Sequence, residues 1–339
     1  MTLTWSILSK VTGNACFISD ILFTGPQANS HIFEAPLSRR TDHHFKLRRK
    51  FYQPKPNILL QFSGREIDGR SVAKLVHDSV ADIEKDTDPG FFGRLLSKHY
   101  QVNDLKNSGF ILSVMRENEI GHIGVHREQW NCDVSNQNNF ELFYGGSGKI
   151  FAEGLDLHET FNENYHQEGT SDVLKPALDL VLKSFRHEMF SPEEFPFFGY
   201  GGWIELFEYR RSGFVPISFA INILRKLPED RISFEGRVIS HYVDGGLVIA
   251  NISGEGIRNP KDSPPTIWLV RDLFGEKQSQ PTKFIGPQIV IGSPDYIMNI
   301  VIQDDIAIMS TSNDDIISYE KSTGFFLDRN KILEILEDD

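Results

Sequence analysis

TLTWSILSKVTGNACFISD (residues 2–20) decides the start of the fold, because two strand-like runs flank a turn in it. Both runs are rich in β-branched and aromatic side chains, and Thr12-Gly13-Asn14 between them has turn chemistry. The stretch therefore predicts a β-hairpin. Thr2 stands directly behind Met1, so removal of Met1 would leave a threonine whose amine and hydroxyl can act together as base and nucleophile.

The composition is that of a globular protein. Of the 339 residues, 40% are hydrophobic and 12% aromatic, which argues against disorder. A net charge of −12 argues against nucleic acid or an anionic membrane as a partner. No secretory leader precedes residue 20, no apolar run is long enough to span a bilayer, and two cysteines are too few for a disulfide framework. We therefore expect a cytoplasmic protein.

The middle of the chain contains both helical and strand-like patterns. The 3.6-residue apolar period of helices occurs in residues 71–85, 91–101 and 171–190. Strand-like runs occur in residues 58–62, 109–115, 120–125, 140–146 and 199–209. Strands in blocks with helices in pairs predict an antiparallel α+β fold and not a regular βαβ alternation.

Beyond about residue 225 the pattern changes to longer alternating strands. Residues 231–254 and 295–310 alternate apolar and polar side chains, and residues 330–339 have the pattern of a short acidic helix. We therefore predict a first domain at residues 1–225 and a β-rich C-terminal extension at residues 226–339.

Several motifs of known chemistry are incomplete. Residues 145–150 look like a phosphate loop, but the first glycine is missing and Ile150 replaces the residue that would bind magnesium. His122 and His126 are four residues apart in a strand pattern, where they do not form the helical zinc pair. We therefore expect no metal, nucleotide or organic cofactor.

Four other motifs follow one another along residues 2–210. They are TLTWSILSKVTGNACFISD (2–20), FKLRRKFYQPKPNILLQFSG (45–64), FYGGSGKIFAEGL (143–155) and GYGGWIELFEY (199–209). This series resembles the proteasome β-subunit family of N-terminal nucleophile (Ntn) hydrolases, including the related bacterial double-ring peptidases. The matching positions are Thr2 or Thr4, Gly13, Asp20, Lys46 with Lys50 as the alternative, Gly64, Gly146, Ser147, Gly148, Gly201 and Gly202.

The resemblance implies a role for each candidate. The threonine would be the nucleophile and its amine, with an ordinary pKa of about 7.7–8.0, the base. A lysine held by an aspartate would lower the pKa of the hydroxyl, a serine would lie near the amine, and backbone N–H groups of the glycine turn would stabilise the oxyanion. The candidate catalytic residues are Thr2, Asp20, Lys46, Ser147 and Gly148.

Two features of the motifs bear on this interpretation. Thr4 keeps the family's spacing to Asp20, but ordinary methionine removal exposes Thr2, so Thr2 is the preferred nucleophile. The family's late Asp and Ser are absent, and Phe197 and Tyr200 stand near those positions, so the family's proton network around the amine is incomplete here.

The resemblance implies an αββα four-layer Ntn-hydrolase sandwich that cleaves peptide or amide bonds through an acyl-enzyme intermediate. It also implies a peptide or protein substrate and a homo-oligomer, either a ring or an open ring. It does not determine whether an ATPase partner is involved. One alternative is a catalytically silent structural or interaction protein. Another is a small-molecule amidase or acylase on the same fold.

Overall fold

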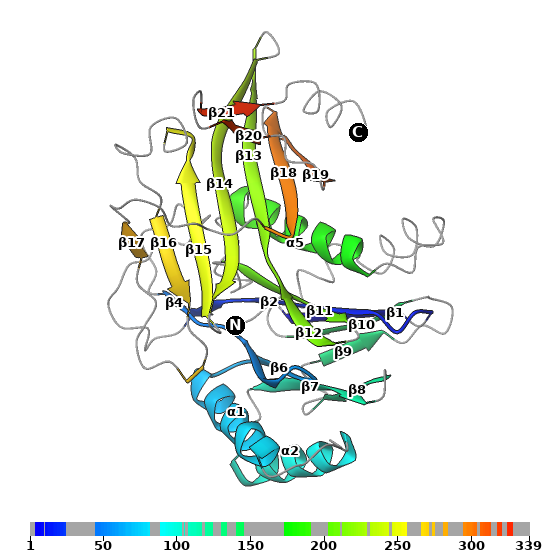
Figure 1. Cartoon of the computed structure of the whole chain (residues 1–339). Helices are drawn as coiled ribbons and strands as arrows, with labels where there is room; N and C mark the ends of the chain where they lie inside the picture. The colour runs from blue at the N-terminus through cyan, green and yellow to red at the C-terminus, as the bar shows by residue number, and fades with distance from the viewer. Residues whose placement is uncertain are drawn as a thin grey trace.

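The computed structural model of this chain shows a mixed α+β protein whose strands lie mostly in antiparallel sheets (Figure 1). It describes residues 4–9, 11–24, 45–81, 89–103, 105, 108–116, 119–124, 130–133, 140–145, 173–190, 203–210, 212–228, 231–243, 246–255, 266–270, 273–274, 281–283, 294–303, 306–312, 317–320 and 324–327. The predicted class, antiparallel α+β, is confirmed.

The first sheet has six strands in the order β12-β11-β2-β1-β10-β9. They are β1 (Thr4–Ser9), β2 (Ala15–Asp20), β9 (Trp130–Asp133), β10 (Phe140–Gly145), β11 (Ile204–Arg210) and β12 (Gly213–Ile217). The hairpin predicted for residues 2–20 is confirmed, because β1 and β2 pair antiparallel. Gly13 has a φ of 71° in its turn, a conformation that favours glycine.

The second sheet has four strands in the order β5-β6-β7-β8. They are β5 (Phe51–Lys55), β6 (Ile58–Ser63), β7 (Gly109–Arg116) and β8 (Glu119–Gly124). Between β6 and β7 the chain forms α1 (Glu66–Ala81) and α2 (Pro89–Asn103), which confirms the two predicted helices and the following hairpin.

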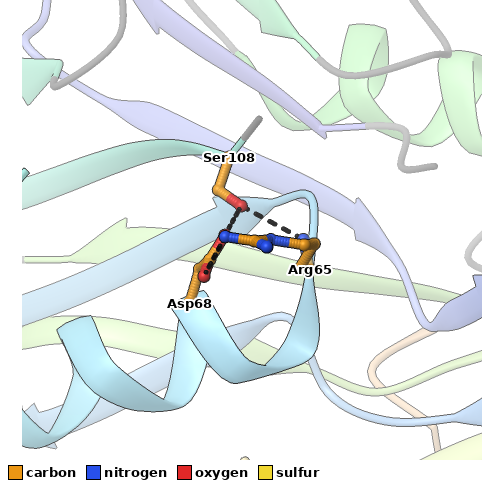
Figure 2. A network of polar contacts seen from close by, with 3 residues as sticks. All are labelled: Arg65, Asp68 and Ser108. Atoms are coloured by element: carbon orange, nitrogen blue, oxygen red, sulfur yellow. Dashed lines mark hydrogen bonds and ion pairs between the residues drawn. The ribbon is translucent and has the colours of Figure 1, made fainter. Parts of the chain in front are cut away.

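Helix α1 begins at Glu66, earlier than the predicted start at residue 71. Its first turn is polar and contacts the segment before β7, so it does not show in the apolar period. Figure 2 shows the contact: Asp68 accepts hydrogen bonds from Arg65 and from the hydroxyl of Ser108. The backbone amide of Arg65 in turn donates to Ser108 Oγ. This cluster ties the start of α1 to the start of β7.

Three hydrophobic cores show what each face contacts. Apolar residues of α1 and α2 pack on one face of the four-stranded sheet. A second core, with Phe17 and Leu59, lies between the two sheets. A third, with Trp5 and Phe185, lies between the six-stranded sheet and α5 (Leu174–Phe190), the helix predicted at residues 171–190. Helices therefore cover the outer faces of both sheets (Figure 1).

A third sheet has seven strands in the order β17-β16-β15-β14-β13-β18-β19, with the pair β13 and β18 parallel. They are β13 (Phe219–Leu227), β14 (Arg231–Val243), β15 (Gly246–Ser253), β16 (Thr266–Val270), β17 (Pro281–Lys283), β18 (Tyr296–Gln303) and β19 (Ile306–Ser312). Two antiparallel two-stranded sheets complete the described strands: β3 (Leu22–Thr24) with β4 (Phe45–Leu47), and β20 (Ile317–Glu320) with β21 (Gly324–Leu327).

The seven-stranded sheet shares its core with the first sheet. The chain passes from β12 into β13 at Ser218, so the predicted boundary between residues 225 and 226 falls inside β13. The ring of Phe219 stacks on Trp203, with centroids 5.1 Å apart, in the core around α5. The sheet therefore packs on the rest of the chain through α5 and Trp203, and also through Tyr242 of β14, whose ring contacts Phe207.

Two further observations complete the fold. The helix predicted at residues 330–339 lies outside the described residues. Within the described part of the chain, no helix is long and apolar enough to cross a membrane.

Candidate functional site

Thr4 begins β1 near the middle of the six-stranded sheet. Its cross-strand neighbours are Ser19 on β2 and Gly145 on β10. The side chain is fully buried, and its hydroxyl has no hydrogen-bond partner among the described residues. Because an unpaired buried hydroxyl costs roughly 1–3 kcal/mol, stability does not account for this threonine.

Asp20 and Lys50 form a buried ion pair at the end of β2, one residue beyond Ser19, the cross-strand neighbour of Thr4. Asp20 follows Ser19 at the end of β2, and its Oδ1 lies 2.6 Å from Lys50 Nζ. Both side chains are fully buried. Burial lowers the pKa of the Lys50 ammonium below its ordinary value of 10.5, while the negative charge of Asp20 opposes that shift. The Lys50 ammonium, whose pKa burial lowers, is thus bound to the residue that follows Ser19, and Ser19 is the cross-strand neighbour of Thr4.

The lysine in this pair is Lys50, the alternative in the sequence prediction, and not Lys46. Lys46 lies in β4, where its backbone pairs with Phe23 of β3. Its side chain lies outside the described residues. Lys50 reaches Asp20 because the backbone turns between β4 and β5, where the Arg48 amide donates to the carbonyl of Ile21. Among the described side chains, the lysine that Asp20 binds is therefore Lys50, and the role predicted for Lys46 stays a prediction.

Arg48, Arg49 and Lys50 are three consecutive cations, and all are buried. Each has an acidic partner on a different element: Glu66 on α1, Glu205 on β11 and Asp20 on β2. The sequence prediction missed Arg49 and Glu205. The only local signal was an RRK run placed between two strand-like stretches, where side chains are expected to be buried.

Glu205 accepts hydrogen bonds from two consecutive residues, Arg49 and Lys50. Its Oε1 lies 2.6 Å from Arg49 Nε, and the backbone N–H of Lys50 also donates to its carboxylate. Burial raises the pKa of Glu205, and Arg49 with this N–H opposes the rise. The guanidinium of Arg49 lies over two rings, 5.2 Å from the centroid of Tyr242 and 5.9 Å from that of Phe207.

The other predicted site residues lie outside the described residues. Thr2 precedes the first of them, and Ser147 and Gly148 follow Gly145, the last described residue of β10 and the cross-strand neighbour of Thr4, in the sequence. Phe197 and Tyr200 also lie outside. The pairing of Gly145 with Thr4 therefore places the end of β10 next to Thr4.

This arrangement can support acid–base and nucleophilic chemistry. The hydroxyl of Thr4 lies at the start of β1 and the carboxylate of Asp20 at the end of β2, and the ammonium of Lys50, which directly precedes β5, contacts that carboxylate. Among the described residues, no group of three or more His, Cys, Asp or Glu side chains could hold a metal ion.

In comparisons with known proteins, no family model matches this chain and no curated protein is similar to it.

Proposed function

We propose that this chain is a threonine-type Ntn hydrolase that cleaves peptide or amide bonds on an αββα four-layer sandwich. Three observations support the proposal. Helices cover the outer faces of two packed antiparallel sheets. The hairpin of β1 and β2 starts with a threonine and ends in an aspartate. That aspartate binds a buried lysine.

In this proposal Thr4 is the nucleophile, and one observation carries that choice. The hydroxyl of Thr4 is fully buried without a hydrogen-bond partner among the described residues, beside the strand that holds the pair of Asp20 and Lys50. Thr2 stays a prediction that the described residues do not test. A free amine on Thr4 requires cleavage of the bond between Leu3 and Thr4.

Each residue then has a defined task. The free amine of Thr4 takes the proton of its own hydroxyl as Oγ attacks the substrate carbonyl. The Lys50 ammonium stabilises the developing alkoxide, and Asp20 holds the ammonium in place. The amine gives its proton to the leaving nitrogen, and water then hydrolyses the acyl ester and restores the threonine.

Peptidase and amidase assays on matched variants test this proposal. Thr4→Ala should abolish hydrolysis of every substrate in a panel of fluorogenic peptides and simple amides. Thr12→Ala is the control, because Thr12 is an exposed threonine in the turn after β1. Hydrolysis that survives Thr4→Ala would contradict the proposal, and the preferred substrate class would separate a peptidase from a small-molecule amidase.

We further propose a homo-oligomer, ring or open ring, as the resemblance implies, which light scattering of the purified chain would test. A catalytically silent structural protein is the second candidate. Complete burial of Thr4, Asp20 and Lys50 favours it, because a substrate must reach the hydroxyl. Release of residues 1–3 without any gain of hydrolysis would support this second candidate.

A further inference from the structure

Glu205 lies in the same cross-strand row as Thr4. Ser19 on β2 pairs with Thr4 on one side and with Glu205 on the other, so the three residues share one face of the sheet. Adjacent strands are about 4.8 Å apart, which puts the backbones of Glu205 and Thr4 roughly 10 Å apart. Glu205 therefore belongs to the surroundings of the proposed site without touching the nucleophile.

The carboxylate of Glu205 holds two consecutive residues at once. It binds the guanidinium of Arg49 at 2.6 Å and accepts a hydrogen bond from the backbone N–H of Lys50. A contact to the backbone of Lys50 restricts the position of its Cα atom, from which the side chain extends. The opposite end of that side chain meets Asp20.

This cluster is not arranged for stability alone. Removing a carboxylate and a guanidinium from water costs several kcal/mol per ion, and an apolar pair is often as stable or more stable. The second oxygen of Glu205, Oε2, is buried and has no hydrogen-bond partner among the described residues. The ionic arrangement is therefore expected to serve the placement of a neighbouring group.

We propose that Glu205 is a positioning residue for the Lys50 ammonium: it holds the guanidinium of Arg49 and the backbone of Lys50, and so sets the ammonium against Asp20. The inference rests on the proposed function for its kinetic consequence only. Its effect on Lys50 is independent of whether the chain is an enzyme.

The charges around Lys50 predict what a substitution does. Asp20 faces its ammonium from β2, Glu205 lies beyond on β11, and Arg49 is its chain neighbour, with Tyr242 of β14 over Arg49. The negative charge of Glu205 raises the pKa of Lys50. Glu205→Gln removes this charge and leaves the Arg49 cation uncompensated, so both effects lower the pKa of Lys50.

The test follows the Lys50 ammonium in the full chain with ¹³C-labelled lysine, whose Cε chemical shift reports the proton. Lys50→Arg identifies the signal. In Glu205→Gln the midpoint of the Lys50 titration should fall by on the order of one pH unit. Glu208→Gln is the matched control, because Glu208 lies on the same strand and pairs with Arg210 at 2.7 Å on the surface; its midpoint should equal that of the unmodified chain.

Glu205→Asp keeps the charge on a shorter side chain. Its midpoint should lie between those of the unmodified chain and Glu205→Gln, and it replaces Glu205→Gln as the deciding variant where the latter does not fold. A folded Glu205→Gln with the unmodified midpoint would overturn the inference. So would a Glu205→Asp midpoint equal to the unmodified one.

The kinetic consequence uses a threonine-directed β-lactone. Glu205→Gln should form the adduct more slowly, on the order of tenfold, with the alkaline limb of the pH profile displaced to lower pH. Equal rates and profiles in the two proteins would overturn the positioning role. An unmodified chain that forms no adduct contradicts the proposed function instead, and the lysine midpoint still decides the role of Glu205.

Discussion

Two ionic clusters in this chain use similar side chains in different surroundings. At the start of α1, Arg65 binds Asp68 (Figure 2). The Arg65 side chain is 56% exposed. At the end of β2, Lys50 binds Asp20, and both side chains are fully buried. An exposed ion pair contributes little to the free energy of unfolding, and its loss costs little. A buried pair loses much hydration on folding, and removal of either partner leaves an uncompensated buried charge. The first cluster is therefore a helix attachment, and the second needs a reason beyond stability.

The largest expected effect comes from breaking the buried pair. Lys50→Met leaves the Asp20 carboxylate buried without its ammonium, which should cost about 3–5 kcal/mol in the free energy of unfolding. Urea unfolding at neutral pH measures it. The double variant Asp20→Leu/Lys50→Met should recover most of this loss, because it removes both charges. If Lys50→Met lowered the free energy of unfolding by less than Arg65→Met does, the proposed difference between the buried and the exposed pair would be contradicted.

Asp68→Ala should have the next largest effect. Asp68 is almost fully buried, although its partner Arg65 is exposed, and it accepts hydrogen bonds from Arg65 and Ser108. The hydrogen bond from the buried Ser108 hydroxyl to this charged group contributes about 1.5–3 kcal/mol and the contacts from the exposed Arg65 contribute little, so we expect a loss within that range as α1 partly detaches from the segment before β7. Urea unfolding, with circular dichroism as the readout, checks it. A loss equal to that of Lys50→Met would show that the two clusters do not differ.

The free energy of unfolding above pH 10 tests the surroundings of Tyr242, whose ring lies against Arg49 of the buried cluster. Burial and the charge of Glu205 raise the pKa of Tyr242 well above 10.0. Above pH 10 the unfolded chain loses this phenol proton and the folded chain keeps it, so stability falls as pH rises, by up to about 1.4 kcal/mol per pH unit. Tyr242→Phe removes that contribution. Its stability relative to the unmodified chain should be constant from pH 7 to 9 and increase above pH 10; a constant difference throughout would contradict the pKa shift.

Arg65→Met should have the smallest effect. Its exposed ion pair contributes about 0–1 kcal/mol, and that contribution should shrink as salt rises from 0.05 to 1 M, roughly. The loss from Lys50→Met should hardly change over the same range, since buried charges are little screened. Unfolding of both variants at two salt concentrations measures the contrast. Equal salt dependence would contradict the assigned difference in burial.

The sequence predicted those parts of the fold that local patterns determine. The hairpin of β1 and β2 follows from Gly13 and its flanking β-branched residues, and the helices follow from their apolar period. The start of α1 was missed because its first turn packs through Asp68 and not through apolar side chains. The sheet change at Ser218 was missed because β12 and β13 have the same strand pattern on both sides of it.

The site was predictable only in part, for a different reason. Asp20 stands at the end of a predicted strand, but Lys46 and Lys50 lie four residues apart in one basic segment. Lys50 meets Asp20 where the segment between β4 and β5 is held by the backbone hydrogen bond from Arg48 to Ile21, a contact that the sequence does not show. Glu205 is more than 150 positions from Arg49 in the chain, so only the paired sheet brings the two together.

The most direct test of Thr4 as nucleophile is the site of covalent modification. The purified chain is treated with a threonine-directed β-lactone, and its N-terminal peptide is sequenced by mass spectrometry. We expect one adduct, on the hydroxyl of a Thr4 that has become the first residue, and no adduct in Lys50→Arg or Thr4→Ala. An adduct on Thr2, or a folded chain that begins with Thr4 and remains unmodified, would contradict the claim.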